Sequence, residues 1–375
     1  MDIRFFNTEI DGWNNSTIEL TAITNKFLSL SYTTHYREAA EFELVMYQQD
    51  FEQAYLKGGR IDYEKFSSTF VLFGAKKLGL IQKIVKSFDG GVLKLIFKGT
   101  TCLGLLNYRS LDNTIKCSGN ILNFLGDKIG TKFFTEGDRA MPEISLSFVE
   151  GENIKKWFEV TGGTVMELVQ STLESSGCFI EATFDGLNLD GDKKLHLKIN
   201  FKPYNFKRKQ ENYPTIVLDE NDIENSEWSF DTSDYFNVAY VHGEGEGPAR
   251  KMEYVEQPYF TDRIETKGLL RRELYVDARD LQSEGQDGEP NLSPNDYKAL
   301  LVDRGKEKLR EKKPLLGYSI TLRKNTKALE GFFVGDVLSI KDKCLDLIFE
   351  LLVAKTEEVW TKDGYAIVYS LQNWR

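Results

Sequence analysis

The amino-acid sequence carries β-strand patterns at both of its ends and helical patterns mainly between them. Near the N-terminus, Phe42, Leu44 and Met46 occupy every second position, and near the C-terminus Tyr369 and Leu371 continue a similar alternation. A period of two places successive side chains on opposite faces of a strand. We interpret the two ends as halves of one β barrel that is split in sequence.

The local patterns divide the chain into four regions. Residues 1–110 are predicted to form the first half of a barrel-like hub domain, 111–205 an α/β insertion, 206–314 a β-rich domain ending in a helix, and 315–375 the strands that complete the barrel. Within the first region, the Gly- and charge-containing segment 47–66 is predicted to be a surface loop. The predicted fold class is α+β, mostly β, and multidomain.

Two helices have clear end signals. Thr164 and Glu167 form a capping box, and Gly177 stands where that helix would stop. A later helix begins with Ser293 as its cap and Pro294 at its first position. Its buried stripe is expected to consist of Tyr297, Leu300, Leu301 and Leu309.

Composition excludes several classes of protein. The formal net charge of -10 argues against sequence-independent nucleic-acid binding, which requires Lys and Arg to neutralise phosphates. No uncharged apolar run approaches the ~20 residues that a membrane span needs, and residues 1–13 lack the pattern of a signal peptide. The cysteines are far apart in sequence, so we expect buried, reduced thiols at Cys102, Cys117, Cys178 and Cys344.

Motifs for catalysis, metals and cofactors are not found. The three histidines, His35, His196 and His242, do not form a metal-binding motif. The Gly-rich run 241–248 lacks the Lys and Ser/Thr of a phosphate-binding loop. We interpret it as a tight connection whose glycines accept positive φ and whose glutamates are hydrated or meet a basic partner such as Arg250. We therefore predict no catalytic residues, no metal and no cofactor.

Short segments of the C-terminal half occur in an order typical of one protein family. They are Asp231–Ser233, Asn237–Val241, Gly243–Gly247, Ala249–Arg250, Arg271–Glu273, Val276–Asp280, a helix with Gly305 and Leu309, Gly335–Val337 and Asp363–Tyr365. In this order they resemble the tail-tip hub, or tail-associated, proteins of siphophages that infect Gram-positive bacteria, which are related to contractile-tail baseplate hubs. The family-pattern residues, with structural roles, are Gly243, Gly245, Gly247, Arg250, Asp277, Arg279, Gly335 and Asp336.

The resemblance implies a structural function in the virion. Three copies would form a hub that closes the distal end of the tail tube and opens for DNA on host recognition. The hub would be assembled in the host cytoplasm and would contact the distal tail protein hexamer, with the tape measure protein and receptor-binding proteins as further expected contacts. DNA would pass through without being specifically bound. Many family members continue into a cell-wall hydrolase, and we expect this chain, ending at Arg375, to lack that activity.

Two other functions stay open on the sequence alone. A cell-wall hydrolase or peptidase could use a carboxylate pair that forms only in the fold, because such pairing is spatial. A carbohydrate-binding or receptor-binding module could use aromatic side chains in loops, for which Tyr55, Tyr63 and Tyr259 are the candidates.

Overall fold

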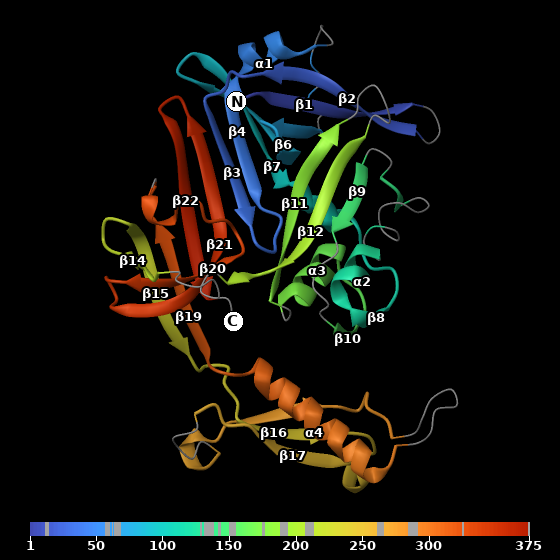
Figure 1. The fold of residues 1–375 in the computed structure, drawn as a ribbon. Coiled ribbons are helices and arrows are strands. Elements are labelled where there is room, and N and C mark those ends of the chain that lie inside the picture. The colour runs from blue at the N-terminus through green and yellow to red at the C-terminus, as the bar shows by residue number, and fades with distance from the viewer. Residues whose placement is uncertain are drawn as a thin grey trace. The chain divides into compact units, whose positions relative to one another are not determined.

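The structure is a computed structural model of the chain (Figure 1). It describes residues 1–375 except 12–14, 57–60, 62, 64–68, 128–129, 131–138, 142–143, 150–154, 175–176, 188–193, 207–213, 261–265, 284–291, 325 and 374–375. The chain separates into two compact units, of which unit 1 comprises Met1–Ser226 with Ser319–Arg375 and unit 2 comprises Glu227–Tyr318. The four predicted regions, with boundaries near residues 110, 205 and 314, stay a prediction.

One large sheet forms the framework of unit 1, and two of its strands, Ile223–Asp231 and Leu315–Leu322, continue past the boundary into unit 2. Its strands are β1 (Ile3–Asp11), β2 (Asn15–Thr24), β3 (Ser29–His35), β4 (Glu41–Tyr47), β5 (Phe70–Phe73), β6 (Lys77–Asp89), β7 (Val92–Thr101), β13 (Asn205–Phe206), β14 (Ile216–Leu218), β15 (Ile223–Asp231), β19 (Leu315–Leu322), β20 (Asp336–Asp342), β21 (Leu347–Thr361) and β22 (Gly364–Asn373). The main order is β15-β19-β22-β21-β3-β4-β7-β6-β5-β1-β2, and β20 joins β13 and β14 to β21. The predominance of strands confirms the predicted fold class.

Strands from the two ends of the chain pair directly. β21 runs antiparallel to β3, from Lys355 opposite His35 to Thr361 opposite Ser29, and the two lie side by side in Figure 1. The two ends therefore belong to one sheet, as the alternation at both ends predicted. Closure of this sheet into a barrel stays a prediction.

A short helix replaces part of the predicted surface loop. α1 (Gln48–Ala54) buries the ring of Phe51, whose centroid lies 5.0 Å from that of Phe5 and 5.2 Å from that of Phe97. A helix this short owes its stability to tertiary packing rather than to propensity. The loop prediction was therefore wrong for residues 48–54, and much of the remaining segment lies outside the described residues.

The segment 102–203, which covers most of the predicted α/β insertion, belongs to unit 1. It contains η2 (Cys102–Tyr108), β8 (Ile115–Asn120), α2 (Ile121–Asp127), β9 (Ile144–Val149), β10 (Lys155–Val160), α3 (Val165–Glu174), β11 (Cys178–Leu187) and β12 (Leu195–Pro203). β10 pairs with β8, and β11, β12 and β9 form a three-stranded sheet. The capping box is confirmed, because Thr164 N–H donates to Glu167 Oε2 at 2.6 Å and Glu167 N–H donates to Thr164 Oγ1 at 3.1 Å.

Unit 2 is a three-stranded sheet with one long helix on one face. Its elements are β16 (Val238–His242), η6 (Gly247–Ala249), β17 (Met252–Glu256), η7 (Gly268–Leu270), β18 (Glu273–Asp277) and α4 (Pro294–Glu311), with strand order β17-β16-β18. Ser293 caps α4 as predicted, accepting from Asp296 N–H. Leu300 is 40% exposed, so its placement in the buried stripe was wrong, whereas Tyr297, Leu301 and Leu309 are buried.

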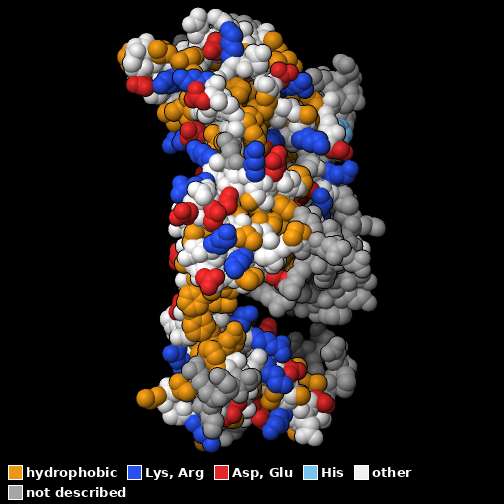
Figure 2. Space-filling view, turned by 60° about the vertical axis from the view of Figure 1, so that its left-hand side comes forward, with side chains coloured by type: hydrophobic (Ala, Val, Ile, Leu, Met, Phe, Trp, Pro, Cys, Tyr) orange, Lys and Arg blue, Asp and Glu red, His pale blue; other side chains and the backbone are white. Residues whose placement is uncertain are grey.

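The surface combines charges of both signs with hydrophobic side chains (Figure 2).

Cys102, Cys117 and Cys178 are buried free thiols as predicted, but Cys344 is exposed because it lies in the turn between β20 and β21. Within the part of the chain that the structure describes, no helix is long and apolar enough to cross a membrane.

Candidate functional site

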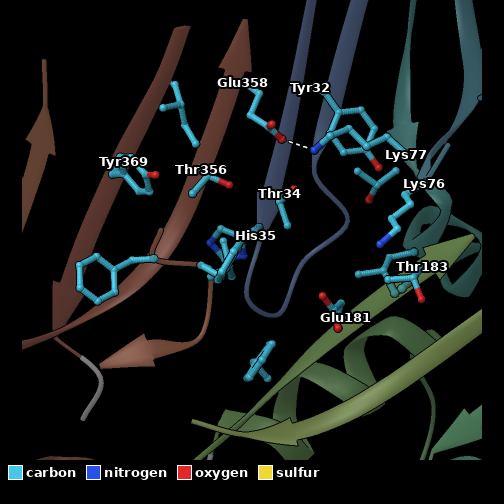
Figure 3. Close-up of a pocket in the computed structure, with 18 of the residues that line it drawn as sticks. Tyr32, Thr34, His35, Lys76, Lys77, Glu181, Thr183, Thr356, Glu358 and Tyr369 are labelled. Atoms are coloured by element: carbon cyan, nitrogen blue, oxygen red, sulfur yellow. Dashed lines mark hydrogen bonds and ion pairs between the residues drawn. The ribbon is translucent and has the colours of Figure 1, made fainter. Parts of the chain in front are cut away.

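Unit 1 contains a cavity of about 820 Å³ (Figure 3). It lies between strands from both ends of the chain and the insertion, since its walls come from β3, β11, β21, β22 and residues 326–334. Much of the lining is apolar, including Cys102, Leu103, Phe179, Ile180, Ala182 and Ile367. No single stretch of sequence marks it.

An ion pair with aromatic neighbours forms part of the cavity wall. Lys77 pairs with Glu358, and the Lys77 ammonium lies 5.0 Å from the centroid of the Tyr32 ring. The Tyr365 hydroxyl donates to Glu358 Oε1 at 2.8 Å. Burial, followed by this hydrogen bond, raises the pKa of Tyr365, so its phenol stays protonated at neutral pH. Lys77, Glu358 and Tyr365 therefore form a fixed polar part of the cavity wall, and the protonated Tyr365 phenol is not an activated nucleophile.

Several titratable groups of the cavity wall have local ionic partners. Burial lowers the pKa of His35, although Glu38 lies 4.0 Å from its Nδ1 and opposes that shift. Glu181 pairs with Lys202, and Glu358 pairs with Lys77. A glycosidase needs two carboxylates facing one substrate, whereas these two each hold a lysine. Among the described residues, no cluster of His, Cys, Asp and Glu could hold a metal.

Two family-pattern residues, Gly335 and Asp336, shape one wall of the cavity. A Cβ added to Gly335 would lie 2.5 Å from a ring carbon of Phe179, and its φ of +97° also favours glycine. The buried Asp336 carboxylate accepts from Phe333 N–H at 3.0 Å and from Asn205 Nδ2 at 2.8 Å. Together they fix the segment that carries residues 332–334 into the lining.

In unit 2, the glycine-rich segment packs against α4. A Cβ added to Gly243 would lie 2.5 Å from the hydroxyl oxygen of Tyr297. That hydroxyl accepts from Glu244 N–H at 2.9 Å and donates to the Leu281 carbonyl at 2.9 Å. Sequence reasoning placed Tyr297 in the buried stripe but missed this bridge, although a buried Tyr hydroxyl usually requires a partner.

The Glu244 carboxylate accepts hydrogen bonds from Lys251 and from both the backbone N–H and the hydroxyl of Ser283. Lys251 Nζ donates to its carboxylate at 2.6 Å, and Ser283 N–H donates at 2.9 Å. These hydrogen bonds, led by that of Lys251, lower the pKa of Glu244 to about 2. Glu244 thus meets a basic partner, as one of the two expectations allowed, but the partner is Lys251. Arg250, the example named from the sequence, instead donates from Nε to the Gly245 carbonyl at 3.2 Å.

The remaining family-pattern residues also have local structural contacts. Gly245 and Gly247 have φ values of +96° and +52°, as the interpretation of a tight connection requires, whereas Gly243 has no positive φ and that part of the expectation was wrong. Asp277 accepts two hydrogen bonds from Arg279 Nε, at 2.9 and 3.0 Å, and its pKa falls to about 2 chiefly for that reason. The structure thus brings the unit 2 residues into two clusters, 243–250 and 277–279, and places Gly335 with Asp336 in unit 1.

Comparisons with known proteins agree with this architecture. The fold is similar to that of a tail protein from Neisseria meningitidis MC58, with a TM-score of 0.52 and 15% identity over 99% of this chain and 96% of that chain. It is also similar to the 43 kDa tail protein of prophage MuSo2 from Shewanella oneidensis, with a TM-score of 0.52 and 13% identity over 99% and 98% of the two chains.

Sequence comparison identifies the family. No curated protein sequence matches the chain. Residues 124–369, more than half of the chain, match the family described as Siphovirus ReqiPepy6 Gp37-like protein. This match and the shared fold confirm the resemblance to siphophage tail proteins. The chain belongs to the Siphovirus ReqiPepy6 Gp37-like family.

Proposed function

We propose that this protein is a structural subunit of the siphophage tail tip or baseplate, located in the virion, and that three copies form the hub that closes the tail tube. Family membership and the fold shared with two tail proteins support the structural role. The hub would open on host recognition to let DNA pass.

The observation that carries the trimer is an open margin of the large sheet. β15 has β19 as its neighbour on one side and forms the end of the described sheet on the other. Its residues Trp228 and Phe230 are 48% and 42% exposed. A strand with one unpaired edge and exposed aromatic side chains can pair with another chain, and a closed ring of copies would satisfy that edge without open-ended growth.

The opposite margin of the sheet is covered in part. Ala22 of β2 forms a bridge with Tyr55, and Leu56 N–H donates to the Thr21 carbonyl at 2.8 Å. Two of the exposed-aromatic candidates of the sequence, Tyr55 and Tyr63, pack against the N-terminal core rather than standing free. We therefore assign the contact between copies to β15.

The expected partners follow from the hub. Three chains with two barrel-like domains each would present pseudo-sixfold symmetry to the distal tail protein hexamer. The tape measure protein and receptor-binding proteins would be further neighbours. A net charge of -10 would repel phosphates, so DNA would pass without being held. We also propose that the chain is not a hydrolase, because Glu181 and Glu358 pair with lysines; clearing of cell-wall substrate in a zymogram would contradict this.

The trimer is tested by the mass of the full chain in solution, measured by light scattering with and without the distal tail protein. We expect three times the chain mass for the wild type at micromolar concentration. The double change Trp228→Lys and Phe230→Lys should give monomers, because two charges would be placed at the contact. The control Leu345→Lys changes a side chain that is 40% exposed in the turn between β20 and β21, and it should leave the trimer intact.

A wild-type chain that stays monomeric under both conditions would refute the trimer. A trimer that persists in the double variant would instead refute β15 as the contact.

A further inference from the structure

The face of the unit 2 sheet that α4 leaves uncovered carries a row of three tyrosines. Tyr240 on the central strand lies opposite Tyr254 on one side and Tyr275 on the other. The alternate residues Ala239 and Val241 point to the other face and belong to the core formed with α4. The three rings therefore lie side by side across the free face.

Two further rows flank the tyrosines, because the registers align the three strands over five positions. On one side are Met252, His242 and Asp277, and on the other are Glu256, Val238 and Glu273. We call these nine residues the tyrosine face. It combines aromatic rings with carboxylates at both ends and a histidine at one end, and Val238 at the other end is fully buried.

The rings of the tyrosine face are held in place by the protein itself. Arg271 donates to the Tyr240 hydroxyl at 2.9 Å and to the Tyr254 hydroxyl at 3.0 Å, and its Nε donates to Glu273 at 2.5 Å. The His242 ring centroid lies 4.6 Å from that of Tyr275. A ligand would therefore meet side chains that are already ordered, which reduces the entropy lost on binding.

The exposed members of the face are the outer two tyrosines, Met252 and the three carboxylates. The side chains of Tyr275, Met252 and Tyr254 are 60%, 52% and 42% exposed. The charges beside them are paired within the unit, Arg271 with Glu273 and Arg279 with Asp277. Paired charges give little net attraction for a phosphate chain, so the chemistry favours an uncharged ligand that offers both C–H groups and hydrogen-bonding groups.

We propose that the tyrosine face binds a neutral glycan, a chain of hexose or N-acetylhexosamine units. Sugar rings present C–H faces that stack on aromatic rings, and their hydroxyl or acetamide groups would reach Glu256 at one end and Asp277 at the other. Tyr254 and Tyr275 are two strand spacings apart, about 10 Å. The row therefore spans roughly two to three sugar units.

A second copy of the chain fits this face less well. Three strands over five residues cover roughly 10 Å by 17 Å, far below the ~800 Å² per partner of a stable protein interface. A protein partner would also remove water from the Arg271–Glu273 and Asp277–Arg279 pairs, which is costly. A glycan can leave these pairs hydrated and use bridging waters.

The experiment uses the full-length protein and calorimetric titration with chitotetraose, cellotetraose and a rhamnose tetrasaccharide, with oligo-dT as an anionic comparator. We expect at least one tetrasaccharide to bind, and oligo-dT not to bind. Tyr275→Ser should weaken that binding by about tenfold, because it removes the most exposed ring. The control Tyr108→Ser removes a tyrosine that is 47% exposed in unit 1 and should change nothing.

A Tyr275→Trp variant provides a second readout that keeps an aromatic ring, and its fluorescence should change on adding the bound sugar. Failure of all three tetrasaccharides to bind at millimolar concentration would overturn the proposal, as would undiminished binding by Tyr275→Ser. Loss of oligomers in Tyr275→Ser, without sugar binding by the wild type, would identify the face as a contact between copies instead. These outcomes are independent of the β15 test.

Discussion

Removing the hydroxyl of Tyr297 tests whether one buried oxygen ties α4 to the glycine-rich segment. The change Tyr297→Phe keeps the ring and creates no large cavity, but it removes the hydrogen bonds to Glu244 N–H and to the Leu281 carbonyl, both 2.9 Å long. Each hydrogen bond contributes about 1 kcal/mol, and groups left unpaired cost more where water cannot reach them. We expect unit 2 to lose about 2 kcal/mol of stability.

Hydrogen exchange is the suitable assay, because a chain with two compact units need not unfold in one step. A loss of about 2 kcal/mol corresponds to roughly 30-fold faster exchange of protected amides in residues 238–256. The control Tyr275→Phe removes a hydroxyl from a side chain that is 60% exposed, and should change rates by less than about twofold. Equal rates in the two variants would refute the bridging role of the Tyr297 hydroxyl.

Three further changes test other contacts. Glu244→Gln should lower the stability of unit 2 at pH 7. Urea unfolding should show the stability difference between the wild type and the variant shrinking as the pH falls from about 4.5 to about 2, because the hydrogen bonds of Glu244 stabilise the fold only while its carboxylate is charged. A stability difference that does not depend on pH would contradict this. Gly335→Ala should lower thermal stability more than Gly331→Ala, which has a similar positive φ but open space at its Cβ; equal losses would exclude the clash as the cause. Thr164→Ala should cost about 0.5–2 kcal/mol and speed exchange at the start of α3, because it removes the oxygen that accepts from Glu167 N–H. Unchanged exchange there would argue against the capping box.

Local signals in the sequence were sufficient to locate the helix ends and many strands. The caps at Thr164 and Ser293 form as predicted, because both depend on side chains within three residues of the N–H groups they satisfy. The alternation of Phe42, Leu44 and Met46 likewise fixed the buried face of β4. The helix α1 could not be predicted from Phe51, because a single aromatic residue among polar neighbours gives no indication that its ring packs against two other rings, those of Phe5 and Phe97.

The candidate site required contacts that sequence spacing cannot supply. The cavity draws on segments near residues 35, 180, 330 and 360. The pairing of β21 with β3 joins two of them, and the hydrogen bond from Ile180 N–H to the Tyr36 carbonyl joins a third. The tyrosine face has the same origin in unit 2: Tyr240, Tyr254 and Tyr275 are separated in sequence by turns, and their alignment depends on the registers of two strand pairs. A shift of one residue in either register would turn one ring to the opposite face.

The glycine-rich segment shows why the partner of a charged side chain is harder to predict than the element it belongs to. The sequence offered Arg250 as a partner for Glu244, and both Arg250 and Lys251 are close enough along the chain. The backbone decides between them: Lys251 N–H donates to the Glu244 carbonyl at 2.9 Å, so these two residues lie directly opposite each other and their side chains meet. Arg250 instead donates from Nε to the Gly245 carbonyl and so links the two ends of the turn. Because the positive φ of Gly245 is part of this geometry, we expect a β-branched residue there to disrupt the Glu244–Lys251 pair as well as the turn.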